Sequence, residues 1–254
     1  SLILNSALPL KKSSTHYESE LKPKISLRLN PMRSQNLINV DRRIDIVNIF
    51  SNNRLGLNES LEGGQSLTMG TEYNLSKKNG SEFLKMSFAQ IYRDINEERL
   101  PIKSKMNSKS SDVVGGIKFK PNNYINFDYD FSLDNNLKTS NYNMTKSNIS
   151  INNFITSFEF LEEQNEVGNE SYLVSDIAYM FNDENKIRYT SRENRKTNLV
   201  EFYNLIYEYK NDCLVAAMEY NKDYYSDRDL KPSEELFFSI TIVPFSQANT
   251  PVLK

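Results

Sequence analysis

The chain has 254 residues, with 31 Lys and Arg against 33 Asp and Glu, and a formal net charge of −2. This balance gives no electrostatic argument for nucleic-acid binding, and a single Cys with a single His excludes a Cys/His zinc cluster. No apolar run approaches the roughly 20 residues that a membrane-spanning helix needs.

The first twenty residues carry few structural signals. The stretch SLILNSALPL is too short to span a membrane, and no cationic segment precedes it as a secretory signal peptide requires. His16 lies in the polar run KKSSTHYESE, so we expect a solvated surface histidine rather than a catalytic base. We therefore expect residues 1–20 to be a poorly structured leader. Because the chain starts without Met, we interpret it as a fragment or processed product that lacks its N-terminal portion.

From residue 24 onward, short stretches alternate apolar and polar residues, which is the period-two pattern of β-strands. The predicted strands are 24–30, 64–75, 82–92, 112–120, 124–133, 152–163, 172–181, 198–210, 213–225 and 235–244. Two further stretches, 138–148 and 184–192, are too polar for the pattern and are assigned as strands by spacing. Helical periodicity is absent at any useful length, so roughly a dozen evenly spaced strands predict an all-β, antiparallel fold.

The stretch YINFDYDFSL, residues 124–133, raises the question of what each side of the sheet contacts. One side is aliphatic and aromatic, and the other carries Asp128 and Asp130. The same polar side of other strands carries Glu159, Asp176 and Glu219. A dry core between two sheets would not accept so many carboxylates, although a soluble sandwich could turn them toward water. In a membrane barrel the apolar side meets lipid and these five carboxylates face the lumen.

The connections between the predicted strands alternate in length along the chain. Tight turns are predicted at 76–81, 121–123, 148–152, 182–185 and 210–212, and mostly longer, more charged loops at 93–110, 134–138, 162–171, 190–196 and 221–234. Outer-membrane barrels show this asymmetry, and a sandwich has no physical reason for it. The 15 tyrosines also suit a lipid boundary. These features favour an antiparallel transmembrane β-barrel.

Three stretches resemble the LptD family of outer-membrane lipopolysaccharide assembly proteins, in its alphaproteobacterial form. NDCLVAAMEYNKDYYSDRDLKPSEELFFSITIVPF (211–245) resembles the family's C-terminal strands, with a similar RDLKP–EE hairpin. DRRIDIVNIFSNNRLGLNESLEGGQSLTMGTEY (41–73) resembles the segment in which a phenylalanine and an Asn–Arg pair precede a glycine-containing strand. FLKMSFAQIY (83–92) resembles the next strand, and the resemblance as a whole covers about residues 20–245.

The resemblance implies that residues 21–245 are the C-terminal part of a larger barrel and that residues 246–254 are a periplasmic tail. It implies an integral protein of the bacterial outer membrane that has no catalytic activity and no cofactor. Such a protein receives lipopolysaccharide from the periplasmic bridge protein LptA and inserts it into the outer leaflet. The plug lipoprotein LptE would occupy the lumen.

The resemblance also assigns roles to particular residues. Cys213 would form a disulfide with the missing N-terminal domain, although the family commonly has adjacent cysteines here and this chain has Leu214 next. The alternative is a small residue within a strand. The last strand would form the lateral gate through which lipid leaves, or it is an ordinary lipid-facing strand. Its gate-side residues are Leu236, Phe238, Ile240 and Ile242.

Other readings remain open from the sequence alone. Lys and Arg of the long loops could contact lipid phosphates, or these loops could simply be solvated over the barrel mouth. A diffusion porin or uptake barrel predicts a barrel that closes within this chain. A soluble β-sandwich binding module predicts extraction without detergent.

Overall fold

The computed structural model describes residues 2–39, 42–56, 62–164, 169–224 and 232–242. These residues form fourteen strands and one short 3-10 helix, η1 (Lys103–Lys105). The strands are β1 (Leu2–Ala7), β2 (Leu10–Ser13), β3 (Tyr17–Asn30), β4 (Gly64–Lys77), β5 (Glu82–Arg93), β6 (Val113–Asn122), β7 (Ile125–Leu133), β8 (Ser140–Ile151), β9 (Phe154–Glu163), β10 (Ser171–Met180), β11 (Asn185–Asn194), β12 (Leu199–Lys210), β13 (Leu214–Asp223) and β14 (Ser233–Ile242). Among the described residues, no helix is long and apolar enough to cross a membrane.

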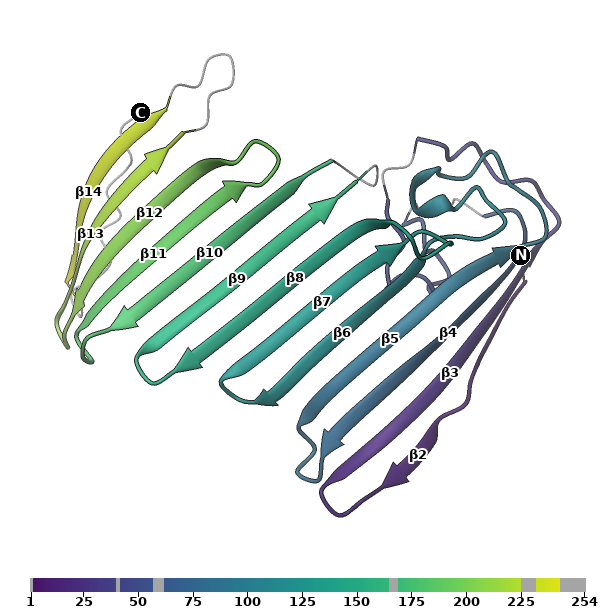
Figure 1. Cartoon of the computed structure of the whole chain (residues 1–254), viewed down its shortest axis with the longest axis horizontal. Coiled ribbons are helices and arrows are strands. Elements are labelled where there is room, and N and C mark those ends of the chain that lie inside the picture. Colours follow the sequence, from purple (N-terminus) through teal and green to yellow (C-terminus); the bar gives the residue numbers. More distant parts are fainter. Residues whose placement is uncertain (1, 40–41, 57–61, 165–168, 225–231, 243–254) are drawn as a thin grey trace. The chain divides into compact units, whose positions relative to one another are not determined.

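The predicted all-β architecture is confirmed. The hydrogen-bonded order runs β1-β3-β4 and then in sequence order to β14, with β2 paired to β3, so that β1 and β14 stand at the ends of the order (Figure 1). The pairs whose registers are resolved are antiparallel, as expected for strands joined by hairpins. The chain divides into two compact units, unit 1 (1–147 and 160–171) and unit 2 (148–159 and 172–254).

Unit 1 begins with strands where the sequence predicted a poorly structured leader. β1 pairs with β3 starting from Leu2 opposite Leu29, and β2 pairs with β3 starting from Leu10 opposite Leu21. His16 is exposed in the turn between β2 and β3. Pairing with β3 satisfies the backbone groups of this polar stretch, so few apolar side chains are needed to order it.

Strands β3 to β7 have one apolar and one polar side. The register places Leu27 opposite Leu67 on the apolar side, and Ser26 opposite Thr68 on the polar side. Ring pairs run along the apolar side of these strands, with Phe83 and Phe119 centred 5.3 Å apart. This is the period-two arrangement that the sequence predicted.

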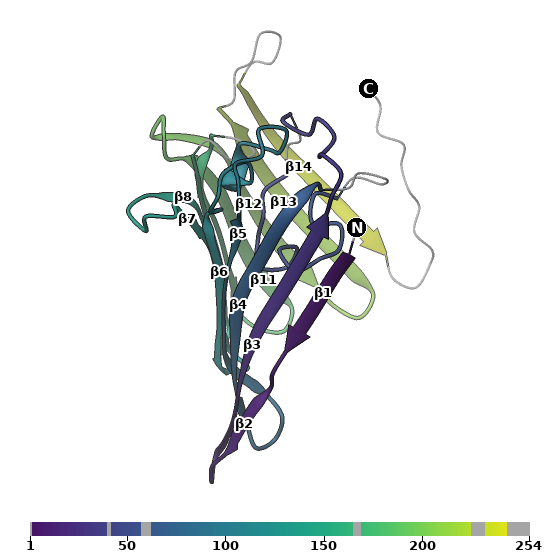
Figure 2. The same ribbon diagram turned by 90° about the vertical axis from the view of Figure 1, so that its right-hand side faces the viewer.

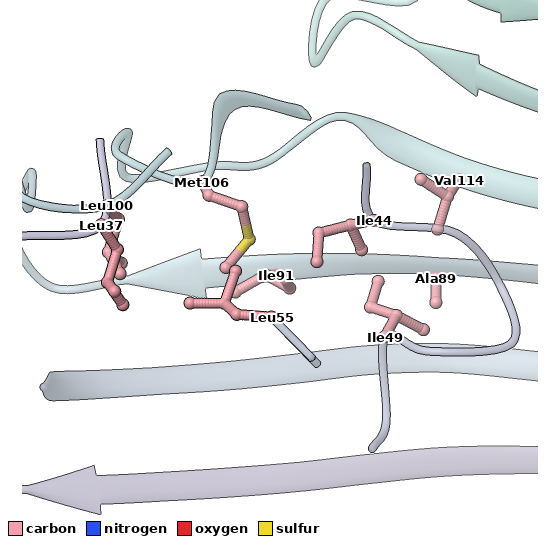
Figure 3. Close-up of a cluster of buried hydrophobic side chains, with 9 residues drawn as sticks. All are labelled: Leu37, Ile44, Ile49, Leu55, Ala89, Ile91, Leu100, Met106 and Val114. Carbon is pink, nitrogen blue, oxygen red and sulfur yellow. The ribbon is translucent and has the colours of Figure 1, made fainter. Parts of the chain in front are cut away.

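An irregular segment covers the polar side of unit 1 near the end of β3. We call its described residues, 31–39, 42–56 and 62–63, the covering segment. Figure 2 shows the irregular segments gathered at the end of β3 to β5 that lies away from the tight turns. Apolar side chains of the covering segment and of loop 94–112 pack there in one cluster with β5 and β6. The buried members are Leu37, Ile44, Ile49, Leu55, Ala89, Ile91, Leu100, Met106 and Val114 (Figure 3).

Unit 2 repeats the two-sided pattern in β10 to β14. On one side Tyr203 lies with its ring centroid 6.4 Å from that of Tyr189 and 6.0 Å from that of Tyr220. Tyr220 is paired with Leu236 of β14, so the aromatic side continues to that edge. The opposite side of β10 and β13 carries the acidic residues described below.

The connections follow the predicted alternation in unit 1, and one connection in unit 2 departs from it. In unit 1 the connections 31–63 and 94–112 are long, whereas the turn 78–81 is tight. In unit 2 the connection 195–198, expected to be a longer loop, is no longer than the tight turn 181–184. The strand β11 extends to Asn194 and takes up residues that the sequence had assigned to that loop.

Candidate functional site

The polar side of unit 1 contains a buried charged cluster beneath the covering segment. We call Arg28, Arg54, Arg93 and Glu62 the arginine cluster. Arg28 comes from β3 and Arg93 from the end of β5, while Arg54 and Glu62 belong to the covering segment. All four residues are buried. The strands supply two cations and the covering segment supplies a third cation together with the carboxylate.

Glu62 is the carboxylate that all three guanidinium groups approach, and Arg54 donates hydrogen bonds to it. Arg54 Nε donates to Glu62 Oε2 at 2.6 Å, and Arg54 Nη2 donates to Oε1 of the same carboxylate. Arg93 Nη2 contacts Glu62 Oε1, and Arg28 Nη1 lies 3.8 Å from Oε2. Two-pronged contact of this kind is the strongest geometry for a guanidinium–carboxylate pair.

The remaining donors bind hydroxyl and carbonyl oxygens. Arg54 donates to the hydroxyls of Thr68 at 3.0 Å and Ser66 at 3.1 Å on β4. Arg28 donates to the carbonyl oxygens of Asn52 and Ser51, each at 3.0 Å. In the part of the chain that the structure describes, the buried Nε atoms of Arg28 and Arg93 have no hydrogen-bond partner.

The cluster carries a positive excess, because three guanidinium groups share one carboxylate. Burial lowers the pKa of Arg54 to about 9, which still leaves its guanidinium charged at neutral pH. Buried charge is costly unless it is paired and hydrogen-bonded, so removal of Glu62 would leave three buried cations without their common counter-ion.

Backbone contacts fix the position of Glu62. Asn30 Nδ2 donates to the carbonyl oxygen of Glu62 at 3.0 Å, and the N–H of Gly63 donates to Ser34 Oγ at 2.9 Å. A Cβ atom at Gly63 would lie 2.3 Å from the backbone nitrogen of Ser34 and 2.4 Å from the carbonyl oxygen of Met32. Only glycine permits this approach, which brings the two ends of the covering segment together.

A second anchor holds the middle of the covering segment. The guanidinium carbon of Arg43 lies 3.3 Å from the ring centroid of Tyr142 on β8, and Arg43 Nη1 lies 3.9 Å from Glu163 Oε1 on β9. Cation–π contact with a tyrosine face is favourable, most of all where water is excluded. The covering segment is therefore held at both its middle and its end.

Loop 94–112 is fastened beside the covering segment by a buried carboxylate. Asp112 Oδ2 accepts from Asn141 Nδ2 at 2.7 Å, and burial raises the pKa of Asp112. The hydroxyl of Ser104 accepts the N–H of Ile44 at 3.0 Å and so links this loop to the covering segment. Lys105 contacts Asp134, and this hydrogen bond lowers the pKa of Asp134.

The five carboxylates predicted to face a lumen lie on the polar sides of their own units, and three of them accept hydrogen bonds there. In unit 1, Asp128 is paired with Lys118, and Asp130 with Gly116. In unit 2, Asp176 accepts from Arg188 Nε at 2.9 Å, Glu219 accepts from Asn204 Nδ2 at 2.6 Å, and Glu159 accepts from the hydroxyl of Tyr172 at 3.1 Å. Asp128 and Asp130 belong to unit 1, whereas Glu159, Asp176 and Glu219 belong to unit 2.

The predicted gate residues share one side of β14. Leu236, Phe238, Ile240 and Ile242 are all exposed. Cys213 is exposed in the turn between β12 and β13 with a free thiol, and its N–H donates to Asn211 Oδ1 at 3.0 Å. The predicted tail, 246–254, and most of the RDLKP stretch lie outside the described residues.

The sequence interpretation missed the arginine cluster. It placed Arg93 in a charged loop, whereas the structure shows it as the last, buried residue of β5. The available signal was that Arg28 and Arg93 both fall on the polar side near a strand end, each followed by a long connection. Nothing in the local pattern relates them to Glu62.

A family model described as LPS transport system D matches residues 3–161. The match includes the whole covering segment and the two motif stretches at 41–73 and 83–92. The resemblance at 211–245 lies outside the matched residues. A search of curated proteins returns no match. The family model covers more than half of the chain, and the chain therefore belongs to the LPS transport system D family, whose members act in lipopolysaccharide transport at the outer membrane.

Proposed function

We propose that this chain forms part of an outer-membrane barrel that passes lipopolysaccharide along its polar side and releases it laterally, without catalysis. The observation that carries the proposal is the division of each unit into an apolar, aromatic side and a side with carboxylates and paired cations. A membrane barrel needs these two sides, one for hydrocarbon and one for water. The family match supports lipopolysaccharide as the cargo.

The edge strand β14 is the proposed exit. It is paired with β13 through its full length, from Leu214 opposite Ile242 to Asp223 opposite Ser233. Its other edge has no partner among the described residues, so in this proposal it meets a strand from elsewhere in a complete barrel. The exposed apolar row from Leu236 to Ile242 would face the acyl chains that leave there.

Partners follow from the same proposal. A plug lipoprotein such as LptE would contact the polar side, and a periplasmic bridge protein such as LptA would deliver cargo at the end with the tight turns. Cys213 lies at that end with its thiol exposed, so it is placed to form a disulfide with a preceding domain in an oxidising compartment.

Photo-cross-linking in cells that express the full-length protein tests this function. A cross-linking amino acid replaces Asp128 on the polar side or Phe131 on the apolar side, and lipopolysaccharide adducts are detected. We expect adducts at Asp128 to disappear when the upstream supply of lipopolysaccharide is stopped. Adducts at Phe131 should persist, because that side contacts lipopolysaccharide already in the membrane. Equal persistence at both positions, or no adduct at Asp128, would contradict the proposal.

A further inference from the structure

Three residues of the polar side form a row across neighbouring strands. Arg28 of β3 is paired with Ser66 of β4, and Ser66 is paired in turn with Arg93 of β5. Side chains of paired residues point to the same side of a sheet, and strands lie about 4.8 Å apart, so the two arginines flank the serine hydroxyl with backbones roughly 10 Å apart. Two guanidinium groups with a hydroxyl between them make a row of hydrogen-bond donors on one side of the sheet.

The covering segment places an anion in front of this row. Glu62 contacts Arg93 and lies 3.8 Å from Arg28, while Arg54 of the same segment binds Ser66 Oγ at 3.1 Å. The side chains of Glu62, Arg28 and Arg93 are at least nine-tenths buried. The row is therefore already occupied by a carboxylate that belongs to the chain itself.

We propose that Arg28, Ser66 and Arg93 form a phosphate-recognition site. Glu62 occupies this site in place of a phosphate when the covering segment is seated, that is, when it lies on the polar side as in the structure. A phosphate-bearing group displaces Glu62, and the covering segment moves off the polar side. This inference rests on the proposed function only for the source of the phosphate, which would be a phosphorylated lipopolysaccharide. Binding of phosphate by the row itself does not depend on transport.

Charge favours the exchange. When the covering segment leaves, it removes Glu62 and Arg54 together, and the row keeps two guanidinium groups. A phosphomonoester carries about −1.5 to −2 charges at neutral pH and has three strong acceptor oxygens, so it matches two guanidinium groups better than a carboxylate with one charge. The buried Nε atoms of Arg28 and Arg93, which have no partner among the described residues, supply further donors.

The covering segment can leave without dismantling the sheet. The ladder that joins β3, β4 and β5 uses backbone groups of the strands themselves. Buried side chains on the polar side of β3 to β5 include the small, polar Ser26, Thr68 and Ser87. The contacts that must be broken are the apolar cluster around Ile49, the arginine cluster, the anchor of Arg43 on Tyr142 and Glu163, and the hydrogen bond from Ile44 to Ser104.

Chemical rescue of the full-length protein in detergent tests the site. Glu62→Ala removes the carboxylate and leaves space for a small anion, whereas Glu62→Gln removes the charge and leaves no space. We expect sodium phosphate to raise the melting temperature of Glu62→Ala by about 5 °C above sodium chloride of matched ionic strength, as expected for a ligand of the folded state well above its dissociation constant. Glu62→Gln and the control Glu72→Ala, also on the polar side of β4, should show no such difference.

The row itself is tested by adding Arg93→Gln to Glu62→Ala, which should abolish the effect of phosphate. An equal shift in phosphate and chloride, or a phosphate shift that survives Arg93→Gln, would overturn the proposal. If Glu62→Ala does not fold, the second measurement below uses a chain that keeps Glu62.

Displacement of the covering segment is measured with a thiol beneath it. Ala89 is 3 % exposed on β5 within the apolar cluster, so Ala89→Cys reports uncovering through its labelling rate when every other cysteine of the full-length protein is replaced, Cys213→Ser among them. We expect inorganic phosphate and phosphorylated lipopolysaccharide each to speed labelling several-fold, and lipopolysaccharide treated with a phosphatase to have no effect. Faster labelling with inorganic phosphate alone would support the phosphate site and exclude lipopolysaccharide as its ligand. No acceleration by either would overturn the proposal.

Discussion

Ile49→Ala should loosen the covering segment while leaving the sheet folded. Ile49 is 1 % exposed and packs beside Ala89 in the apolar cluster (Figure 3). The substitution removes three buried carbons, worth about 0.8 kcal/mol each, and leaves a cavity, so the seated state should lose about 3 kcal/mol. If the covering segment lifts as a unit, the population of the lifted state rises about 100-fold.

The assay is maleimide labelling of Ala89→Cys in the Cys213→Ser background. When reclosing is faster than labelling, the labelling rate follows the lifted population and should rise by the same factor. Val47→Ala is the matched control, because Val47 is in the same turn and 87 % exposed. Equal labelling rates for Ile49→Ala and Val47→Ala would show that Ile49 does not hold the covering segment in place. If the sheet unfolds at the same rate as the thiol is labelled, the covering segment does not lift by itself.

Two further predictions concern the contacts around the covering segment. Gly63→Ala should destabilise the covering segment in its observed position by about 2 kcal/mol or more, because the new Cβ would meet the backbone of Met32 and Ser34. Faster amide hydrogen exchange at residues 62–64 would report this loss. Unchanged exchange at these residues would contradict the close approach of the two backbones. Burial raises the pKa of Asp112 above its value in the unfolded chain, so over the intervening pH range the folded state binds a proton more readily than the unfolded state. The free energy of unfolding should therefore increase as the pH falls from 7 through the raised pKa, and it should level off near the pKa of the unfolded chain. Asp112→Asn should lack this part of the pH profile in denaturant titrations, and an identical profile in both proteins would exclude Asp112 as its source.

The period-two pattern predicted strands well where both sides were distinct. The strand expected at 124–133 is observed as β7, from Ile125 to Leu133, because its aromatic side is opposed by Asp128 and Asp130. The polar strands β8 and β11 were expected from spacing alone. Their cross-strand partners, such as Thr190 opposite Asp176, supply what the local pattern lacks.

The N-terminal strands and the covering segment could not be derived from local pattern. β2 is the short stretch LKKS, which has no apolar side. Its backbone hydrogen bonds to β3 order it instead. The covering segment has no periodic pattern, because its apolar residues pack against positions far along the chain, including Ile91 and Val114. The arginine cluster joins Arg28 to Arg93 through the register of three strands, and register is a property of the sheet rather than of any window of sequence.

In the proposed barrel, one side of these strands contacts hydrocarbon and the other contacts water. The 254 residues contain no tryptophan, so a single tryptophan is placed at a chosen position of β12 and its signal is taken as the difference from the unsubstituted full-length protein. Leu205→Trp and Tyr207→Trp test the aromatic side, and Asn204→Trp and Glu208→Trp test the polar side, in the full-length protein reconstituted into bilayers with brominated lipids. Bromine should quench the first pair strongly and the second pair weakly. Equal quenching of both pairs, or none of either, would show that the two sides of β12 do not contact different solvents.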